Sequence, residues 1–389
     1  MKEGWEYKTL GEVGSFIRGG NFSKKDFVED GFPCIHYGQI HMRFGIETSA
    51  HLSCVPATIV KKDRCVCKGD LVIAITSEDD EGSCKCTAWM ADYNAYVGGH
   101  TAIYRHTLEP KYVSYYFRSS QFQKAKLQYT HGFKVVEINP KDIAKILIPI
   151  PPVSEQQKIV DYLDSAFAKI EAIKAKAEKS LNEAQTLFSA TLERMLQAKI
   201  GWEETSMSDM CSIKSKLVDP TGNEYKNLIH VGGANITSVT GEFIDLKTAS
   251  EEKLTSGKFK FDDNVVLYNK IRPYLVKVAK PDFCGLCSAD MYPLTPATHI
   301  YRNFLYYILI SKRFTDYAIN GSARAGMPKV NRECLFAYKC SVPQIEEQRQ
   351  IADTLDSIKI KVDQLQVNYE RMCKECDALK QAILRQVFE

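Results

Sequence analysis

The chain has 389 residues, of which 44% are hydrophobic and 25% charged, and its formal net charge at pH 7 is +3. This composition excludes a disordered or low-complexity chain, and the length predicts two domains because a single core rarely grows beyond roughly 250 residues. No apolar stretch is long enough to span a bilayer and the first residues lack the apolar core of a signal peptide, so a cytoplasmic protein without membrane contact is expected.

Residues 1–150 are predicted to form a first globular domain of mixed helix and strand. Short β-branched runs bounded by Gly, Asp, Asn and Pro are typical of strands, and the aromatic-rich stretch at 112–126 predicts a helix. The stretch Asn139-Pro140-Lys141-Asp142 begins like an adenine-methyltransferase loop but lacks its second proline and stacking aromatic residue, so it is interpreted as a helix N-cap turn. The sequence has neither a Walker A loop nor a Gly-x-Gly-x-x-Gly motif, so no cofactor is expected in this chain.

The segment 151–199 opens with PPVSEQQKIVDYLDS and is predicted to be one long helix. Prolines that cannot continue a strand ladder are followed by Ser154 and Glu155, which favour the first turn of a helix. Such a helix extends roughly 65 Å at 1.5 Å per residue, too far to be buried in one small domain. Its predicted heptad seam is Ile159, Leu163, Ala166, Ile170, Ile173, Ala177, Ser180, Ala184, Leu187 and Thr191.

Residues 200–342 are predicted to form a second globular domain that repeats the first. Gly4-Trp5 returns as Gly201-Trp202, and CIHYGQI at 34–40 parallels LIHVGGANI at 228–236. The two tryptophans are expected to pin the start of each domain to its core. A second aromatic-rich stretch at 301–319 predicts another helix.

The last segment, 343–389, opens with PQIEEQRQIADTLDS, which repeats the phrase at 151 after 192 residues. Its predicted seam is Ile351, Leu355, Ile358, Val362, Leu365, Tyr369, Met372, Cys376, Leu379 and Ile383. The expected fold class is therefore α+β: two pseudo-repeated mixed α/β domains separated by two long helices that form an antiparallel coiled coil. The alternative is that each helix packs only on its own domain.

Thirteen cysteines in a chain without an export signal are expected to be reduced. Cys65-x-Cys67 and Cys84-x-Cys86 leave a tetrahedral zinc site open, although ordinary buried thiols explain them better. Cys284 and Cys287 have the spacing of a redox pair but no second corner for a metal.

Basic residues in and beside predicted loops are candidate contacts to DNA, because Lys and Arg neutralise phosphates and Arg reads base edges. Each one by itself is more simply a solvated surface charge. Two loops are favoured, NKIRPYLVK at 269–277 and GSARAGMPK at 321–329. The candidates are Lys24, Lys25, Arg43, Lys61, Lys62, Lys134, Lys270, Arg272, Tyr274, Arg324 and Lys329.

Taken together, the sequence resembles the specificity subunits of type I restriction and modification systems. The resemblance is carried by the phrase Pro-x-x-x-Glu-Gln-x-x-Ile-x-x-x-Leu-Asp at 151–164 and 343–356, the helices it opens, the Gly-Trp starts and Ile271-Arg272-Pro273-Tyr274-Leu275. Gln344 stands where the first copy has Pro152. The resemblance implies that 1–150 and 200–342 are target recognition domains, each reading one half of a split double-stranded DNA sequence.

The resemblance also implies a division of labour among subunits. The paired helices would set the unread gap and dock two methyltransferase (M) subunits, which bind S-adenosylmethionine and methylate adenine. Separate restriction (R) subunits would use ATP and magnesium, and this chain would catalyse nothing. Apolar residues off the predicted seam are expected either to back onto the domains or to form the methyltransferase-docking surface, for which Phe188, Leu192, Leu384 and Phe388 are the candidates.

Two other functions stay open. A coiled-coil scaffold whose heads bind proteins would have no salt-dependent affinity for DNA. A stand-alone methyltransferase is disfavoured by the missing cofactor loop and would bind S-adenosylmethionine by itself.

Overall fold

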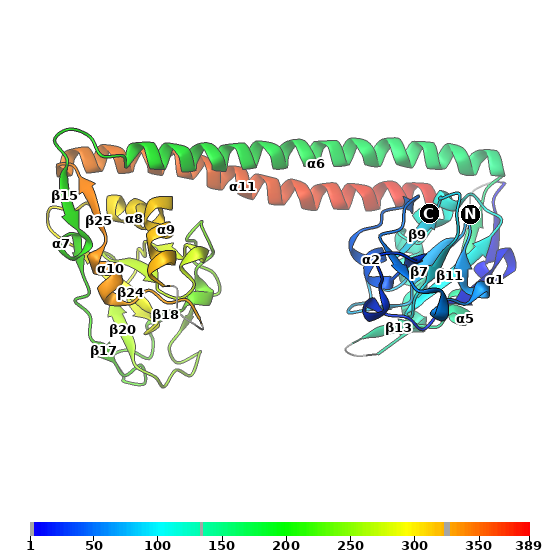
Figure 1. The fold of residues 1–389 in the computed structure, drawn as a ribbon, viewed down its shortest axis with the longest axis horizontal. Helices are drawn as coiled ribbons and strands as arrows, with labels where there is room; N and C mark the ends of the chain where they lie inside the picture. The colour runs from blue at the N-terminus through cyan, green and yellow to red at the C-terminus, as the bar shows by residue number, and fades with distance from the viewer. Residues whose placement is uncertain (1–3, 133–134, 323–326) are drawn as a thin grey trace. The chain divides into compact units, whose positions relative to one another are not determined.

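The computed structural model describes residues 4–132, 135–322 and 327–389 (Figure 1). The predicted DNA contacts Lys134 and Arg324 therefore lie outside the described residues. The chain divides into two compact units, residues 1–175 with 371–389 and residues 176–370. The sequence suggested four consecutive segments, whereas each compact unit combines one globular domain with portions of both long helices.

Unit 1 contains two central sheets and short helices. A five-stranded sheet has the order β2-β11-β7-β9-β4 and a four-stranded sheet the order β5-β3-β10-β6. The elements are β1 Glu6–Thr9, α1 Leu10–Val13, β2 Gly14–Arg18, β3 Phe32–Ile35, α2 Tyr37–Met42, β4 Glu47–Thr48, β5 Ser53–Val55, β6 Cys65–Val66, β7 Leu71–Ala74, β8 Thr76–Ser77, β9 Cys86–Trp89, β10 Ala95–Val97, β11 Thr101–His106, α3 Pro110–Tyr116, α4 Ser120–Lys126, β12 Thr130–His131, β13 Val136–Ile138, α5 Pro140–Ile143 and β14 Leu147–Ile150.

Unit 2 has the same plan. Its sheets have the orders β17-β20-β23-β18-β19 and β16-β24-β21-β22. The elements are β15 Glu203–Ser206, α7 Met207–Met210, β16 Cys211–Ser212, β17 Leu217–Val218, β18 Ile229–Val231, β19 Lys247–Thr248, β20 Lys258–Phe261, β21 Val266–Asn269, β22 Val278–Ala279, β23 Gly285–Cys287, β24 Met291–Pro296, α8 Arg302–Ile310, α9 Lys312–Gly321, α10 Arg332–Ala337 and β25 Lys339–Val342.

The strand pairing confirms the faint internal repeat. The parallel pair β3–β10 has its counterpart in the parallel pair β18–β23, and the antiparallel pair β1–β14 in β15–β25. Gly4 and Gly201 both have positive φ, +79° and +90°, a backbone conformation that glycine adopts without strain. The repeated Gly-Trp start is therefore a matched turn into the first strand of each domain.

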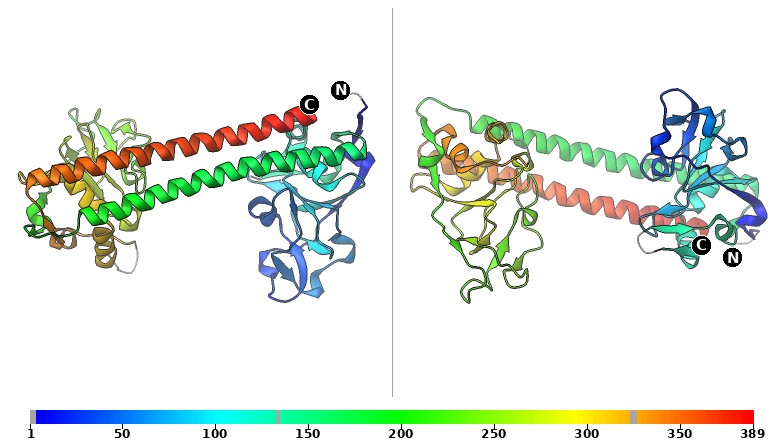
Figure 2. Two further views of the ribbon diagram at one scale, coloured as in Figure 1. Left: turned by 90° about the horizontal axis from the view of Figure 1, so that it is seen from above. Right: turned by 60° about the horizontal axis from the view of Figure 1, so that its bottom comes forward.

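Several local predictions are confirmed. The aromatic stretches form α3 with α4 and α8 with α9. Asn139 is the N-cap of α5, since its side chain accepts a hydrogen bond from the amide of Lys141 at 3.0 Å. The proline-rich entries are followed by α6, Val153–Met195, and α11, Ile345–Phe388, which Figure 2 draws as uninterrupted helices. None of the described helices is long and apolar enough to cross a membrane.

The two long helices pair in antiparallel fashion inside each unit. In unit 1, Glu171 accepts a hydrogen bond from Lys380, and Lys174 Nζ lies 3.2 Å from Asp377 Oδ1, so residue numbers rise along one helix as they fall along the other. In unit 2, Gln185 Nε2 donates to Gln366 Oε1 at 3.4 Å. These pairs share one register, because the residue numbers of each pair add to the same total. The antiparallel coiled-coil prediction is confirmed.

The predicted seam is half right. One of its two heptad positions, for example Leu163, Ile170 and Cys376, is buried or partly buried as expected. At the other position, the residues in the middle of the helices are exposed, among them Ile173 at 55% and Leu187 at 66%. The second row of the seam lies one residue further along each helix. That row is partly or fully buried and consists of Phe167, Lys174, Leu181 and Phe188 in α6 and Lys359, Gln366, Cys373 and Lys380 in α11.

Polar side chains explain this shift. Lys174 and Lys380 lie in the seam because each pairs with a carboxylate of the opposite helix while its stem covers apolar surface, and Lys380 Nζ also lies 5.6 Å from the Phe167 ring centroid. An apolar heptad pattern does not include such lysine positions. The same shift occurs in both helices because each repeats the other.

The domains also pack on the helices of their own unit. In unit 1, Val160 and Leu163 of α6 and Leu384 and Phe388 of α11 belong to the core cluster that contains β7, β11 and α3. In unit 2, Leu192 of α6 and Ile351 and Leu355 of α11 belong to the cluster that contains α8. Each helix therefore buries one side against its partner helix and another against a globular domain.

Candidate nucleic-acid interface

The two loops favoured in the second domain lie next to each other in the structure. Ile271 forms an antiparallel bridge with Lys329, and the amide of Arg272 donates to the carbonyl of Pro328 at 2.9 Å. The amide of Val330 donates to the carbonyl of Lys270 at 2.9 Å. These backbone contacts join the loop after β21 to the segment before α10. We call residues 270–277 with 327–330 the unit 2 loop pair.

The backbone of this loop pair is strained around Arg272. Arg272 and Val276 have left-handed conformations, with φ of 52° and 47°, on either side of the short 3-10 helix Pro273–Leu275. A left-handed non-glycine residue costs roughly 1–2 kcal/mol, and a β-branched valine is especially disfavoured there. The resulting turn leaves Arg272 exposed and Tyr274 52% exposed. Strain at an exposed cation and ring is typical of functional loops.

Lys270 has a different place from the one expected. It is only 8% exposed, its Nζ donates to the carbonyl of Ala289 at 2.5 Å, and it lies 5.0 Å from the ring centroid of Tyr292. Burial lowers the pKa of Lys270. Lys270 therefore anchors the loop from inside and does not offer an exposed ammonium group to DNA. Lys329 is half exposed, with Nζ 3.5 Å from Asp290 Oδ1.

The predicted cations of unit 1 lie on separate surface segments. Lys24 and Lys25 belong to the 3-10 helix Lys24–Asp26, and Arg43 follows the end of α2. Lys61 and Lys62 lie at the start of another 3-10 helix. All five side chains are exposed.

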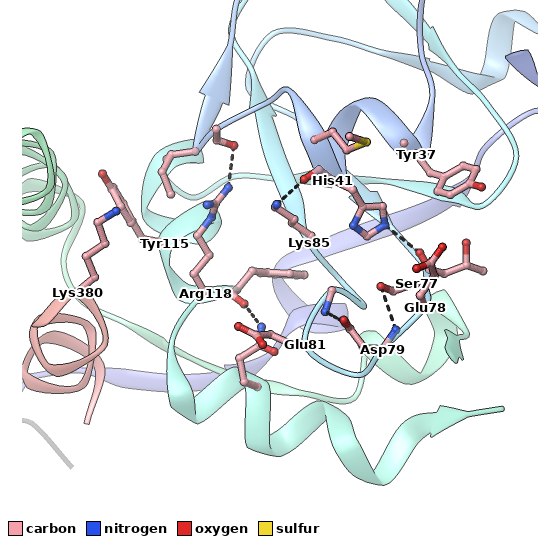
Figure 3. A pocket seen from close by; sticks show the side chains of 18 of the residues that line it. Tyr37, His41, Ser77, Glu78, Asp79, Glu81, Lys85, Tyr115, Arg118 and Lys380 are labelled. Carbon is pink, nitrogen blue, oxygen red and sulfur yellow. Dashed lines mark hydrogen bonds between the residues drawn. The ribbon is translucent and has the colours of Figure 1, made fainter. Parts of the chain in front are cut away.

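A large cavity, of about 1280 Å³, opens in unit 1, and Lys24 and helix α2 line part of it. Figure 3 shows Tyr37 and His41 from the α2 region, Glu78, Asp79 and Glu81 from the loop after β8, and Lys380 from α11 around it. Its cations and acids are mixed: Lys24, Lys85, Arg118, Lys380, Glu78, Asp79, Glu81, Asp164 and Glu171. This lining is less favourable to a phosphate backbone than a uniformly basic groove would be.

The loop after β8 is the structural counterpart of the Arg272 turn, and its charge is opposite. The amide of Ile138 donates to the carbonyl of Ile75, as the amide of Val330 does to that of Lys270, and Ile138 and Val330 are 192 residues apart. The exposed residues that follow in unit 1 are Glu78, Asp79, Asp80 and Glu81. These four residues include no cation, so their composition does not mark them as a DNA contact, and only the backbone hydrogen bonds align this acidic loop with Arg272.

The candidate docking residues are largely occupied within their own units. Leu192, Leu384 and Phe388 are 3%, 1% and 1% exposed, and Phe188 packs against the unit 2 core. The ring centroid of Phe388 lies 5.4 Å from that of Tyr112. These residues therefore back onto the domains, and Leu192, Leu384 and Phe388 have almost no surface left for a partner.

Other apolar residues of the helices are exposed instead, and they follow the internal repeat. Ile173 and Leu187 in α6 are matched after 192 residues by Leu365 and Leu379 in α11, which are 42% and 50% exposed. The contacts Glu171–Lys380 and Lys174–Asp377 place Ile173 at the level of Leu379 in unit 1. Gln185 with Gln366 does the same for Leu187 and Leu365 in unit 2. We call these two pairs the exposed helix pairs.

The cysteines do not support the zinc alternative. Among the described residues, which include all thirteen cysteines, no group of three or more His, Cys, Asp or Glu side chains could hold a metal ion. Burial raises the pKa of the Cys84 thiol to about 12 and that of Cys86 to about 11, so both stay protonated. All thirteen are free thiols, as expected.

Comparisons with known proteins find one family whose members match most or all of this chain. The family model of the type I restriction modification DNA specificity domain matches residues 2–183 and again 199–367. The specificity subunit of the type I restriction enzyme EcoDI from Escherichia coli is 28% identical over 66% of this chain, and the match spans 65% of that protein. The StySPI specificity subunit from Salmonella potsdam is 22% identical over 100% of this chain and 89% of its own length.

Solved structures share the fold. A chain from a type I R-M system superposes with a TM-score of 0.76 at 17% identity, covering 100% of this chain and 98% of its own. The HsdS subunit from Thermoanaerobacter tengcongensis gives a TM-score of 0.54, also at 17% identity, with coverage of 100% and 97%.

Proposed function

This chain belongs to the type I restriction modification DNA specificity family, and on that premise we propose that it is the non-catalytic subunit that selects the DNA target of a type I restriction and modification complex. The observation that carries the proposal is the duplicated family domain, matched at 2–183 and 199–367, with exposed charged loops at equivalent places in the two units. Each globular domain reads one half of a split site. A scaffold with protein-binding heads is not favoured by these relatives.

The two halves of the site differ in sequence, because the two reading loops differ in charge. Arg272 suits guanine, whose O6 and N7 both accept hydrogen bonds in the major groove, whereas Glu78 or Asp79 suits the amino group of cytosine. Lys24, Lys25, Arg43, Lys61, Lys62 and Lys329 supply phosphate contacts that position the domains without reading sequence.

The catalytic groups belong to partner subunits in this proposal. Two methyltransferase subunits bring S-adenosylmethionine, and restriction subunits bring ATP and magnesium. The complex acts on host DNA in the cytoplasm. The chain contributes recognition and a spacer of fixed length, because two modules on a stiff linker engage only half-sites that match their separation.

Replacing Arg272 with alanine tests the reading role. In a complex of the full chain with its methyltransferase partner, Arg272→Ala is expected to cost about 1–3 kcal/mol of binding at DNA with the intact second half-site. For DNA in which that half-site is already altered, the substitution should cost little binding free energy, because the contact is then absent. Binding titrations and methylation of both DNAs measure the difference.

A matched control is Lys339→Ala, which removes an exposed cation on β25 outside the loop pair. It should leave both half-sites unchanged. Equal loss on every DNA would make Arg272 a phosphate contact, and a wild-type complex without sequence-specific, salt-dependent DNA binding would contradict the proposed function.

The exposed helix pairs are the proposed docking surface for the methyltransferase subunits. Each side chain that a partner buries contributes about 1.5–3 kcal/mol, and an aspartate at the same place leaves a charge in the interface. The double variant Leu187→Asp with Leu365→Asp is therefore expected to weaken one methyltransferase contact on the order of hundredfold or more. Co-purification stoichiometry and titration measure this loss.

Asn182→Asp is the control, because it adds a charge at an exposed position on another face of α6. It should co-purify with the full complement of partner. Full binding by the double variant would remove the exposed helix pair from the interface.

A further inference from the structure

The repeated phrase places the same three polar residues at matched positions of the two long helices. These are Glu155, Gln156 and Asp164 in α6 and Glu347, Gln348 and Asp356 in α11, each pair 192 residues apart. A solvated helix face needs no such repetition. In the structure all six side chains contact groups outside their own helix, within the same unit.

The glutamates hold the first turn of each domain. Glu155 Oε1 accepts a hydrogen bond from Trp5 Nε1 at 3.1 Å, and Glu347 Oε2 accepts one from Trp202 Nε1 at 3.3 Å. Glu347 also pairs with Lys199 at 3.1 Å. Each tryptophan thus ties the start of its domain to the entry of a long helix.

The glutamines are buried and bridge three chain segments. Gln156 is 1% exposed, and its amide donates to the carbonyl of Pro151 at 3.0 Å while its carbonyl accepts from the amide of Glu109 at 2.9 Å. Gln348, also 1% exposed, donates to Pro343 and accepts from the amide of Tyr301 at 2.8 Å. An ionised glutamate could accept but not donate, so both hydrogen bonds need the neutral amide of glutamine. Through them each glutamine holds the residue just before α3 or α8.

The aspartates hold those same helices two turns further on. Asp164 accepts hydrogen bonds from Tyr115 Oη at 2.7 Å and from Lys111 Nζ at 2.5 Å. Burial and the neighbouring carboxylate raise the pKa of Tyr115, so its hydroxyl stays protonated and donates. Figure 3 shows Tyr115 at the wall of the unit 1 cavity, which Asp164 also lines.

Unit 2 makes the same contact with a different cation. Asp356 accepts from Tyr307 Oη at 2.6 Å, and Tyr307 matches Tyr115 after 192 residues. The position that matches Lys111 is Asn303, which donates to Asp356 at 2.7 Å, and the charge comes from Lys280, just after β22, at 3.0 Å. In both units an aspartate thus accepts hydrogen bonds from a tyrosine and a lysine, but the lysine comes from α3 in unit 1 and from the segment after β22 in unit 2.

These contacts fix an angle as well as a position. Glu155 and Gln156 lie eight or nine residues before Asp164, which is roughly 12–13 Å along a helix. One anchor would let the domain pivot, whereas two anchors separated along the axis prevent it. We propose that the Glu-Gln-Asp set is an orientation lock that sets the angle of each recognition domain on its helix, and through it the gap between half-sites that the protein accepts. This inference rests on the proposed function.

The consequence for DNA follows from the duplex geometry. Successive base pairs turn by roughly 34°, since a helical turn holds about 10–10.5 of them. A domain that pivots by that amount would face a half-site displaced by one base pair. A loosened lock should therefore relax the choice of gap without changing the bases that are read.

The test uses the full chain with its methyltransferase partner and a DNA library in which the gap varies around the preferred length. For Asp164→Asn or Asp356→Asn, methylation at gaps one base pair longer or shorter should rise about tenfold relative to the preferred gap, as expected from losing one charge-assisted contact. Asp161→Asn and Asp353→Asn are the matched controls, because both residues are exposed, lie on the same helices and are also 192 residues apart. They should leave the gap profile unchanged.

An Asp164 or Asp356 variant whose methylation falls equally at all gaps, with an unchanged profile, would overturn the lock and leave a purely structural role. If these variants fold poorly, Tyr115→Phe and Tyr307→Phe remove only the hydroxyl and carry the same expectation and the same contrary outcome. A wild-type complex that methylates no split site would instead overturn the proposed function, which separates the two failures.

Discussion

Removing one heptad from both long helices together is expected to shorten the gap between the two half-sites. The antiparallel register identifies the segments to delete, residues 177–183 and 368–374, because Lys174–Asp377 and Gln185–Gln366 then still face each other. Seven helical residues span about 10.5 Å and a base pair about 3.4 Å, so the gap should shrink by at most about three base pairs. Sequencing of methylated sites in cells that carry the variant measures the new gap.

Deleting only residues 177–183 is the control for this experiment. It changes the register between the helices, so methylation should fall at every gap and should not move to a shorter one. An unchanged gap after the paired deletion would exclude the helices as the spacer.

Phe388→Ala is expected to destabilise unit 1 by about 3–5 kcal/mol, the usual cost of truncating a buried phenylalanine. Phe388 is 1% exposed and its ring centroid lies 5.4 Å from that of Tyr112 and 5.5 Å from that of Tyr116. The truncation removes these contacts and leaves a cavity among rigid rings. Urea denaturation followed by tryptophan fluorescence measures the change in the free energy of unfolding.

Leu379→Ala provides the comparison in the same helix, because Leu379 is 50% exposed. Its effect should stay within about 0.5 kcal/mol. Equal effects of the two substitutions would contradict the core position of Phe388 and reopen it as a docking residue.

For the two long helices, the apolar pattern of the sequence predicts the elements and their pairing but only part of the buried seam. Sequence periodicity predicted two long helices and their antiparallel pairing, and the structure confirms both. It assigned Ile173, Leu187, Leu365 and Leu379 to the seam, where the structure has Lys174, Phe188, Gln366 and Lys380. A lysine stem can cover apolar surface when a carboxylate of the other helix receives its ammonium group, and that partner cannot be read from one helix alone.

The candidate interface was predictable in parts. The sequence favoured two loops of the second domain from their composition, and the structure joins them through Ile271 and Lys329. It did not reveal that Lys270 is buried, because residue order alone does not show whether a lysine side chain in a loop points into the protein or into solvent. The acidic loop at 78–81 was not predicted either, because only the matching hydrogen bonds Ile138–Ile75 and Val330–Lys270 align it with Arg272.

The sequence by itself determined the duplicated plan, the long helices and the family resemblance, because these depend on repeats and periodicities that local residue order carries. Tertiary structure alone decided which helix residues are buried, which loops meet and what the repeated Glu, Gln and Asp hold. The physical reason is that burial and hydrogen bonding belong to pairs of groups: Asp164 and Asp356 have the same neighbours in sequence, but their cations, Lys111 and Lys280, come from different elements of the fold.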